Sequence, residues 1–285
     1  MKEIVVSKED FLKTYKNKAY GYKVLNQNKF LPVESSPILA SIVAHLMGDG
    51  NLSKDKFVGD FRFYGTLAIL NKIRDDIQKE FGINPYKYYH HPKGEAYILK
   101  YNNCVFSRIL ELCGTPRGDK ILNSFKVPDW IMNGDKEIKK AFLSSIFTDE
   151  MCRMCKRKNG SWGGLEFVMS KSKDKMSSLI HFLNQLKKLL NNFKITSSDI
   201  RVKKNKIYFR KDGKITYPAG FSIHTRMDNR KRFYFNVGFS DEEKQKILYT
   251  SLKQDNVMRE CRSGQTELET QDLTGRFCCD NKCQT

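Results

Sequence analysis

A short apolar segment that ends on a carboxylate occurs twice in this chain, at Ile42–Gly50 (IVAHLMGDG) and Phe142–Glu150 (FLSSIFTDE). In each copy the third and seventh residues are small and the eighth is aspartate: Ala44, Gly48 and Asp49 in the first, Ser144, Thr148 and Asp149 in the second. Small residues four apart lie on one face of a helix and allow two helix backbones to approach closely. We therefore expect two helices that pack against each other.

Packing of these two helices would bring Asp49 and Asp149 together at the C-terminal ends. The helix dipole disfavours negative charge at that end. Carboxylates placed there are poor choices for stability and indicate a cation nearby. The pattern therefore favours a functional pair over the plain alternative, which is two ordinary amphipathic helices that end in capped loops.

The two segments resemble the paired LAGLIDADG motifs of homing endonucleases. In that family two such helices form the interface between two related halves, and the acidic residue at the eighth position of each motif binds the catalytic metal. The resemblance implies that Asp49 and Asp149 are catalytic metal ligands. Backbone carbonyls beside them, at Gly48 and Thr148, are the further metal ligands that we expect.

Two positions depart from the motif. Met47 stands where the motif has its first aspartate, and Glu150 replaces the final glycine of the second copy. The change at Met47 does not affect the eighth position of the motif, which is still aspartate, Asp49. Glu150 adds a carboxylate at the end of one helix, where it assists metal binding, faces solvent, or marks a copy that has lost activity. We include it among the metal-binding candidates.

Phosphodiester hydrolysis requires an activated water and a stabilised leaving oxygen, and divalent ions held by carboxylates supply both. Mg²⁺ takes few protein ligands, so one aspartate per helix end suffices, with Mn²⁺ as the alternative ion. A basic residue near the scissile phosphate would stabilise the transition state. Lys100 lies where relatives place a catalytic lysine, and its counterpart in the second half falls near Val237 and Gly238. The alternative for Lys100 is a plain surface lysine on a strand.

The charge of the chain indicates its partner. Lys and Arg number 51 against 32 Asp and Glu, which gives a net charge of +19. Self-repulsion of this size does not help folding, so it indicates a polyanion, with nucleic acid first and a membrane surface second. The apolar runs are too short to span a bilayer, and residues 1–10 contain no apolar signal core. We expect an intracellular protein that is not secreted and is not in a membrane.

The length of 285 residues fits two halves with flanking segments. We divide the chain into a basic arm at 1–37, a first half at 38–134, a second half at 135–258 and a tail at 259–285 that we expect to be disordered. The resemblance implies an α+β fold of two pseudo-symmetric αββαββα halves. Their antiparallel sheets would form a DNA-binding saddle around a central two-helix interface in a monomer.

The order of elements within each half follows from periodicity and from glycine and proline positions. The first half is predicted to contain a helix at 38–49 after Pro37, strands at 57–64, 86–91 and 94–101, and helices at 66–81 and 103–114. The second half is predicted to contain strands at 165–169, 200–210 and 231–239, and helices through 147, at 174–191 and at 241–252. This repeated order suggests internal duplication.

Alternation along the strands predicts one apolar face under helices and one basic, aromatic face toward DNA. Phe61, Phe63, Ile207, Phe209, Phe233, Phe235 and Val237 are assigned to the apolar face. The DNA-binding candidates on the opposite face are Arg62, Tyr64, Lys206, Tyr208, Arg210, Arg232, Tyr234 and Asn236. A two-stranded ribbon enters the major groove, where arginine reads guanine and asparagine reads adenine. A solvated basic face is the alternative.

Two classes of function remain open. The first is a site-specific double-strand DNA endonuclease associated with intron homing. The second is a binding protein on the same scaffold that has lost cleavage, either an RNA maturase with intron RNA as its partner or a DNA-binding regulator. Eight irregularly spaced cysteines are read as reduced thiols. Cys152 and Cys155 form a CxxC without a second CxxC at zinc-finger spacing, so we expect no zinc site.

Overall fold

The first apolar segment forms the central helix α3 (Pro37–Met47) of a computed structural model that describes residues 2–15, 18–28, 30–90, 96–158, 160–203, 207–210 and 212–262. Ser36 caps this helix by accepting a hydrogen bond from the Leu39 amide at 3.0 Å, and Pro37 occupies the first turn. The helix ends at Met47, two residues before the predicted end, because the backbone of Gly48 leaves the helical region.

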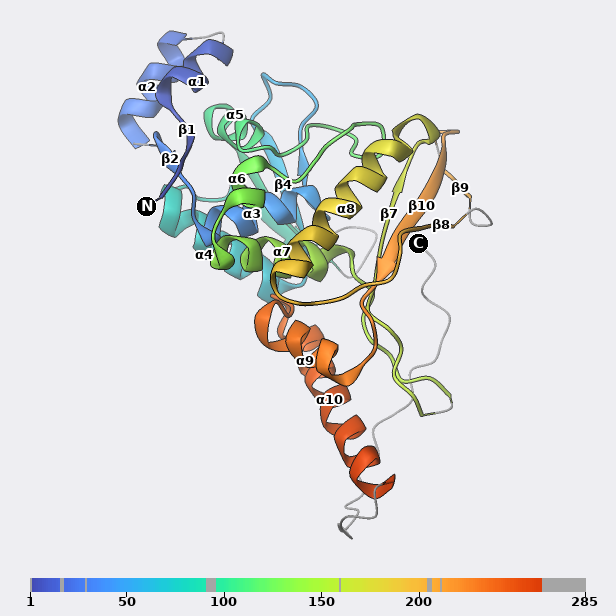
Figure 1. The fold of residues 1–285 in the computed structure, drawn as a ribbon. Helices are drawn as coiled ribbons and strands as arrows, with labels where there is room; N and C mark the ends of the chain where they lie inside the picture. Colours follow the sequence, from blue (N-terminus) through green and yellow to red (C-terminus); the bar gives the residue numbers. More distant parts are fainter. Residues whose placement is uncertain are drawn as a thin grey trace.

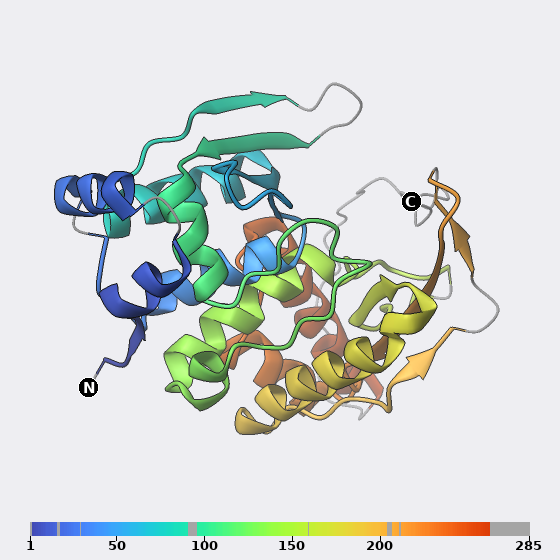
Figure 2. The ribbon, with the colours of Figure 1, turned by 90° about the horizontal axis from the view of Figure 1, so that it is seen from above.

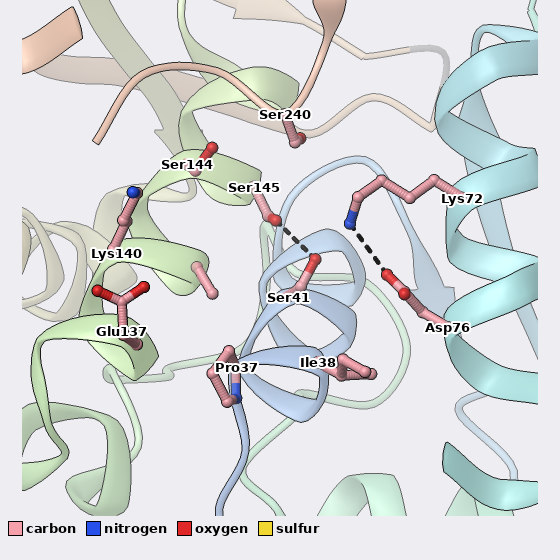
Figure 3. A pocket seen from close by; sticks show the side chains of 11 residues that line it. Pro37, Ile38, Ser41, Lys72, Asp76, Glu137, Lys140, Ser144, Ser145 and Ser240 are labelled. Atoms are coloured by element: carbon pink, nitrogen blue, oxygen red, sulfur yellow. Dashed lines mark hydrogen bonds and ion pairs between the residues drawn. The ribbon is translucent and has the colours of Figure 1, made fainter. Parts of the chain in front are cut away.

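Helix α7 (Lys136–Glu150) contains the second segment and packs along α3, so the predicted two-helix interface is present (Figure 1). Ala44 is fully buried in it. The hydroxyls of Ser41 and Ser145 share a hydrogen bond of 2.8 Å between the helices, as Figure 3 shows. Ser144, which we expected at the contact, lines a shallow cavity of about 290 Å³ along one edge of the interface.

The first half has the predicted αββαββα order. After α3 come β3 (Asn51–Leu52), β4 (Asp60–Gly65), α4 (Leu67–Phe81), β5 (Lys87–His90), β6 (Tyr97–Asn102) and α5 (Cys104–Leu112). The strands form one antiparallel sheet in the order β3-β4-β6-β5. Phe61 and Phe63 point into the core as predicted, and the Phe61 ring stacks on Tyr101 at 4.9 Å.

The second half, which follows the short helix α6 (Asp129–Asn133), is similar but has one strand before α8 and three strands after it. Its elements are α7, β7 (Glu166–Lys171), the 3₁₀ turn η1 (Lys173–Lys175), α8 (Met176–Asn192), β8 (Arg201–Val202), β9 (Tyr208–Phe209), β10 (Ile215–Ser222), α9 (Met227–Asn236) and α10 (Glu242–Arg262). The antiparallel order is β7-β10-β8, with β9 also paired to β10. Phe167 stacks on Phe221 at 5.7 Å, as Phe61 does on Tyr101. The halves are therefore related, with β7 corresponding to β4 and β10 to β6.

The predicted strand at 231–239 is wrong, because this segment lies mostly in helix α9. Phe233 and Val237 are buried one helical turn apart, whereas Phe235 between them is 70% exposed. The real partner of β7 is β10, which the sequence analysis missed because it contains Pro218 and Gly220. Only glycine fits at position 220, since a Cβ there would lie 2.0 Å from the Phe167 carbonyl oxygen.

The N-terminal arm contains the strand β1 (Ile4–Val6), the helices α1 (Lys8–Thr14) and α2 (Lys18–Asn28), and the strand β2 (Val33–Glu34), which pairs with β1. It lies on the side of the first half away from the second half (Figures 1 and 2). At the other end α10 continues to Arg262, beyond the predicted helix end, and residues 263–285 of the predicted tail lie outside the described residues. No helix within the described ranges is long and apolar enough to cross a bilayer.

Candidate active site

Asp149, at the end of α7, lies against the end of α3. The ring nitrogen Nδ1 of His45 donates to both of its carboxylate oxygens, at 3.0 and 3.1 Å. The backbone amide of Asp49 donates to Oδ2 of Asp149 at 3.3 Å. The His45 and Asp149 side chains are each only 5% exposed. The helix packing therefore holds this carboxylate in one orientation beside Asp49, as the repeated segments predict.

Gly48 provides the space for the Asp149 side chain. A Cβ at position 48 would lie 2.5 Å from Oδ2 of Asp149 and 2.7 Å from its Cβ. We expect Gly48→Ala to destabilise the protein by about 1–3 kcal/mol, because one methyl group overpacks this contact. Chemical denaturation measures the loss of unfolding free energy.

Gly65→Ala is the matched control for that substitution. The nearest atom to a Cβ at position 65 lies at 3.8 Å, which is ordinary contact. Equal denaturation midpoints for the two alanine variants would show that Asp149 does not pack on Gly48.

Negative charge is concentrated at this end of the helices. Asp49 has exposed surface, yet desolvation by the surrounding protein and the neighbouring Asp149 raise its pKa to about 6. Burial, followed by the charge of Asp49, raises the pKa of Glu150 to about 8. Glu150 is half-buried, so the expected alternative in which it faces solvent is not what the structure shows.

The raised pKa of Glu150 predicts a pH-dependent stability. The folded state binds the Glu150 proton more tightly than the unfolded chain, so its stabilising contribution is complete below pH 4.5 and is lost as the pH rises through 8. In EDTA, we compare the unfolding free energy of Glu150→Gln with that of the parent. This difference should rise in favour of the variant by on the order of 2 kcal/mol between pH 5 and pH 9. Denaturation series at both pH values measure this. Glu137 is exposed on the first turn of the same helix, so Glu137→Gln should have the same pH dependence of stability as the parent. If Glu150→Gln also had the same pH dependence as the parent, the raised pKa of Glu150 would be contradicted.

Two lysines flank the carboxylates, one at the end of each helix. Lys120 donates through Nζ to the Gly50 carbonyl at 2.8 Å. Lys244 donates to the carbonyls of Thr148 and Met151, at 2.5 and 3.0 Å. Burial lowers the pKa of Lys120, whereas the charges of Glu150 and both aspartates act in the opposite direction. The lysines partly neutralise the acidic cluster.

The lysines occupy related places in the two halves. Lys120 follows β6 and α5, and Lys244 follows β10 and α9. The side chain of Asp241 accepts a hydrogen bond from the Lys244 amide at 2.7 Å, which fixes the start of α10 beneath the site. Each helix end therefore has one aspartate and one lysine from its own half.

The second half also holds the loop that carries Lys120. The side chain of Lys171 donates to the carbonyls of Lys120 and Asn123, and burial lowers the pKa of Lys171 to about 7. Arg210, at the end of β9, pairs with Asp119 at 2.8 Å. The position of Lys120 thus depends on contacts between the halves.

The donor set fits a hard divalent cation. Asp49, Asp149 and Glu150 supply carboxylate oxygens, and burial together with the neighbouring carboxylates raises the pKa of Asp49 and of Glu150. In the part of the chain that the structure describes, no three His, Cys, Asp or Glu side chains are arranged to hold a metal ion by themselves. Mg²⁺ is commonly bound by only one or two protein carboxylates together with water and phosphate. Thr148 is a weaker candidate ligand than expected, because its carbonyl already accepts from Lys244.

Lys100 lies on β6 rather than with the aspartates. Its Nζ pairs with Asp60 at 3.3 Å, and Asp60 also binds Arg62. In the sheet Lys100 is opposite Arg62 on one side and Lys87 on the other, which forms a cationic row on the outer face. Arg62 and Tyr64 lie on that face as predicted.

The counterpart of Lys100 is Gly220, since β10 corresponds to β6 and Phe221 to Tyr101. The predicted place of this position, near Val237 and Gly238, is wrong because the preceding segment is helix α9 and not the counterpart of β6.

The other DNA-binding candidates are distributed differently from the prediction. Tyr208 is exposed on β9 as predicted, but Ile207 and Phe209 are exposed as well, with Phe209 at 78%, so the predicted inward face of this strand is wrong. Lys206 lies outside the described residues. Three candidates lie on helix α9 and not on a strand: Arg232, Tyr234 and Asn236. The structure thus does not place these three on a common sheet face with Arg62.

Three residues of the site were missed by sequence reasoning, namely His45, Lys120 and Lys244. His45 is a polar residue within an apolar segment, which is the signal that could have identified it. No local sequence pattern marks Lys120 or Lys244, because their positions beside the carboxylates depend on where α5 and α9 end.

Comparison with known proteins gives distant similarities. No protein-family model matches the chain. DNA-directed RNA polymerase subunit Rpo1N of Methanocaldococcus jannaschii is 29% identical over 82% of this chain and 18% of its own length. The tRNA-splicing ligase RtcB of the same organism is 25% identical over 91% of this chain and 28% of its own length. The chain therefore spans less than a third of the curated relatives that it matches.

Solved structures of homing endonucleases are also similar. The structure of I-DmoI in complex with DNA and Ca has 15% identity and a TM-score of 0.46, covering 75% of this chain and 97% of I-DmoI. The LAGLIDADG homing endonuclease I-LtrWI bound to target DNA has 13% identity and a TM-score of 0.43, covering 81% of this chain and 93% of I-LtrWI. These scores are too low to transfer the role of any residue to this chain.

Proposed function

We propose that this protein is a divalent-metal-dependent endonuclease that cuts double-stranded DNA at a specific site. The observation that carries the proposal is the juxtaposition of Asp49 and Asp149 at two packed helix ends, each with a lysine from its own half. Paired carboxylates and flanking cations suit phosphodiester hydrolysis, which needs bound cations and stabilisation of developing negative charge. The LAGLIDADG resemblance supports the same reaction.

Each residue has a distinct part in the proposed reaction. Asp49 and Asp149 would hold Mg²⁺ or Mn²⁺, which when bound polarises the phosphate and activates water. His45 holds the Asp149 carboxylate in position through its two contacts. Lys120 and Lys244 stabilise the negative charge that develops on the phosphate oxygens.

The outer face of the first sheet is the proposed DNA-reading surface. The row of Arg62, Lys100 and Lys87 crosses three neighbouring strands, and Tyr64 and Tyr89 lie in the next row. Phosphate contacts from such cations supply affinity, and arginine also reads guanine in the major groove. On this proposal the protein acts as an intracellular monomer, with one half for each side of the target.

The named activities of the curated relatives are not proposed for this chain. The chain matches a polymerase subunit and an RNA ligase, each over less than a third of the relative's length. A segment shared by proteins of such different activity is best explained as a module with a function of its own. This fits an endonuclease carried within other proteins.

A DNA-binding regulator that has lost cleavage is the second candidate. Glu150 favours it, because it replaces the glycine that ends the motif and adds a third carboxylate beside the two aspartates, where burial raises its pKa. The two candidates bind the same duplex and differ only in whether it is cut.

Cleavage of a randomised duplex library separates the candidates. The library is incubated with the protein and Mg²⁺ or Mn²⁺, and the cut ends are ligated to adaptors and sequenced, with EDTA as the control. The endonuclease produces ends that share one sequence and require the ion. Selective retention of a sequence on a filter without cut ends would support the regulator instead.

A further inference from the structure

A second cavity lies between the N-terminal arm and the first half, away from the aspartates. Its volume is about 390 Å³. Three aromatic rings and two cations line it, from Tyr15, Tyr20, Phe57, Lys56 and Arg108. The arm occupies the outer side of the first half in both views of the fold (Figures 1 and 2). The proposed duplex-cutting activity does not use this cavity.

The walls of the cavity are fixed by specific contacts. Arg108 on α5 donates to the hydroxyl and the carbonyl of Thr14, both at 3.2 Å. The Tyr15 hydroxyl and the Cys104 thiol share a hydrogen bond of 3.3 Å. The Tyr15 ring stacks at 4.8 Å on Phe11, which is fully buried. The arm is therefore docked on α5, and the cavity is a built feature of the fold.

The lining combines two exposed rings with one exposed and one largely buried cation. Phe57 is 71% exposed and Tyr20 is 47% exposed. The Lys56 side chain is 61% exposed, with Glu111 at 3.8 Å, whereas the Arg108 side chain is 11% exposed and also pairs with Glu111. A purely apolar ligand would not interact with the two cations, and a bare phosphate would not contact the three rings. Rings that offer π-faces beside basic side chains are the combination that binds unstacked bases together with their phosphates.

We propose that this cavity binds one unpaired nucleotide of a nucleic acid strand. The base lies among Tyr15, Tyr20 and Phe57, and the phosphate lies at Lys56 and Arg108. A volume of about 390 Å³ is large enough for a nucleotide-sized ligand. Bases within a duplex are stacked on their neighbours and do not enter, so the cavity selects single-stranded or flipped-out nucleotides. The inference holds whether or not the chain cuts DNA.

Binding of short labelled strands tests this inference. Fluorescence anisotropy is measured with a single-stranded octanucleotide as RNA and as DNA, with AMP and a duplex of the same sequence as competitors, in EDTA. We expect a single strand to bind and AMP to compete. Phe57→Ala should weaken binding about 10-fold, the effect of removing one stacking ring. The RNA and DNA arms identify which strand is the ligand.

Phe235→Ala is the matched control, because Phe235 is 70% exposed on α9 in the other half. This variant should bind like the parent, and thermal melts should show that both variants remain folded. Equal affinities for Phe57→Ala and the parent, equal losses in both variants, or competition by duplex but not by AMP would each overturn the proposal.

Discussion

Replacing Asp149 by asparagine is expected to lower the rate of double-strand cleavage by at least about 100-fold, a loss comparable to that of removing one charge-stabilising group from an active site. The amide keeps the shape of the carboxylate, and its single oxygen, placed at the Oδ2 position, can still accept from both His45 and the Asp49 amide. It lacks the charge that holds a divalent cation. Duplex affinity, measured on filters in EDTA, should therefore stay close to that of the parent while conversion of a target plasmid to linear form is lost.

Asp129→Asn is the control for this substitution. The Asp129 side chain is 71% exposed on α6 and pairs with Lys126 at 2.7 Å, and its replacement should leave cleavage unchanged. Full cleavage by Asp149→Asn would remove Asp149 from the reaction. Loss of both cleavage and duplex binding would instead indicate that the helix interface had been disturbed.

The helix pair could be predicted from the sequence because its determinants are local. Ser36 and Pro37 mark the start of α3, and the spacing of Ala44 and Gly48 marks the face on which it packs. Repetition of the pattern at Asp149 then implied the pairing of the carboxylates. The first sheet was predictable for the same reason, since alternation in β4 matches the burial of Phe61 and Phe63.

The second sheet was not predictable from local pattern. Residues 231–239 alternate like a strand, but burial of Phe233 against Phe147 at 6.0 Å favours a helix there. Strand β10 lies between β7 and β8 despite containing Pro218 and Gly220, because Gly220 alone allows the close approach of Phe167. In both segments tertiary packing overrides the local preference.

The lysines of the site illustrate a further limit of sequence reasoning. Lys100 was predicted because it lies where relatives of the motif family place a catalytic lysine, yet its charge is paired with Asp60 within the sheet. Lys120 reaches the end of α3 from the loop that follows α5, and Lys244 reaches the end of α7 from the first turn of α10. Their place could be inferred only once β10 and α9 were assigned correctly, since the equivalence of the halves depends on that assignment.

If the protein is the proposed endonuclease, replacing either lysine alone by methionine is expected to give a strand-specific nickase. Lys120 contacts the end of α3, which carries Asp49, and Lys244 contacts the end of α7, which carries Asp149. If each helix end serves one strand, each variant loses charge stabilisation at one scissile phosphate, which costs on the order of 100-fold in rate on that strand. Methionine fills a similar volume but no longer donates to the backbone carbonyls, so a loss of about 1–3 kcal/mol in stability is expected, and a thermal melt should show that each variant remains folded.

The two variants are each other's control. A target duplex labelled separately on each strand and run on a denaturing gel should show nicked product for both, with the nick on opposite strands, and the double variant should cut neither strand. Lys253→Met, on the exposed part of α10, should cut like the parent. If both single variants slow the same strand, the lysines do not divide between the two phosphates. The pairing of one aspartate with one lysine at each helix end, on which the proposed reaction depends, would then have to be abandoned.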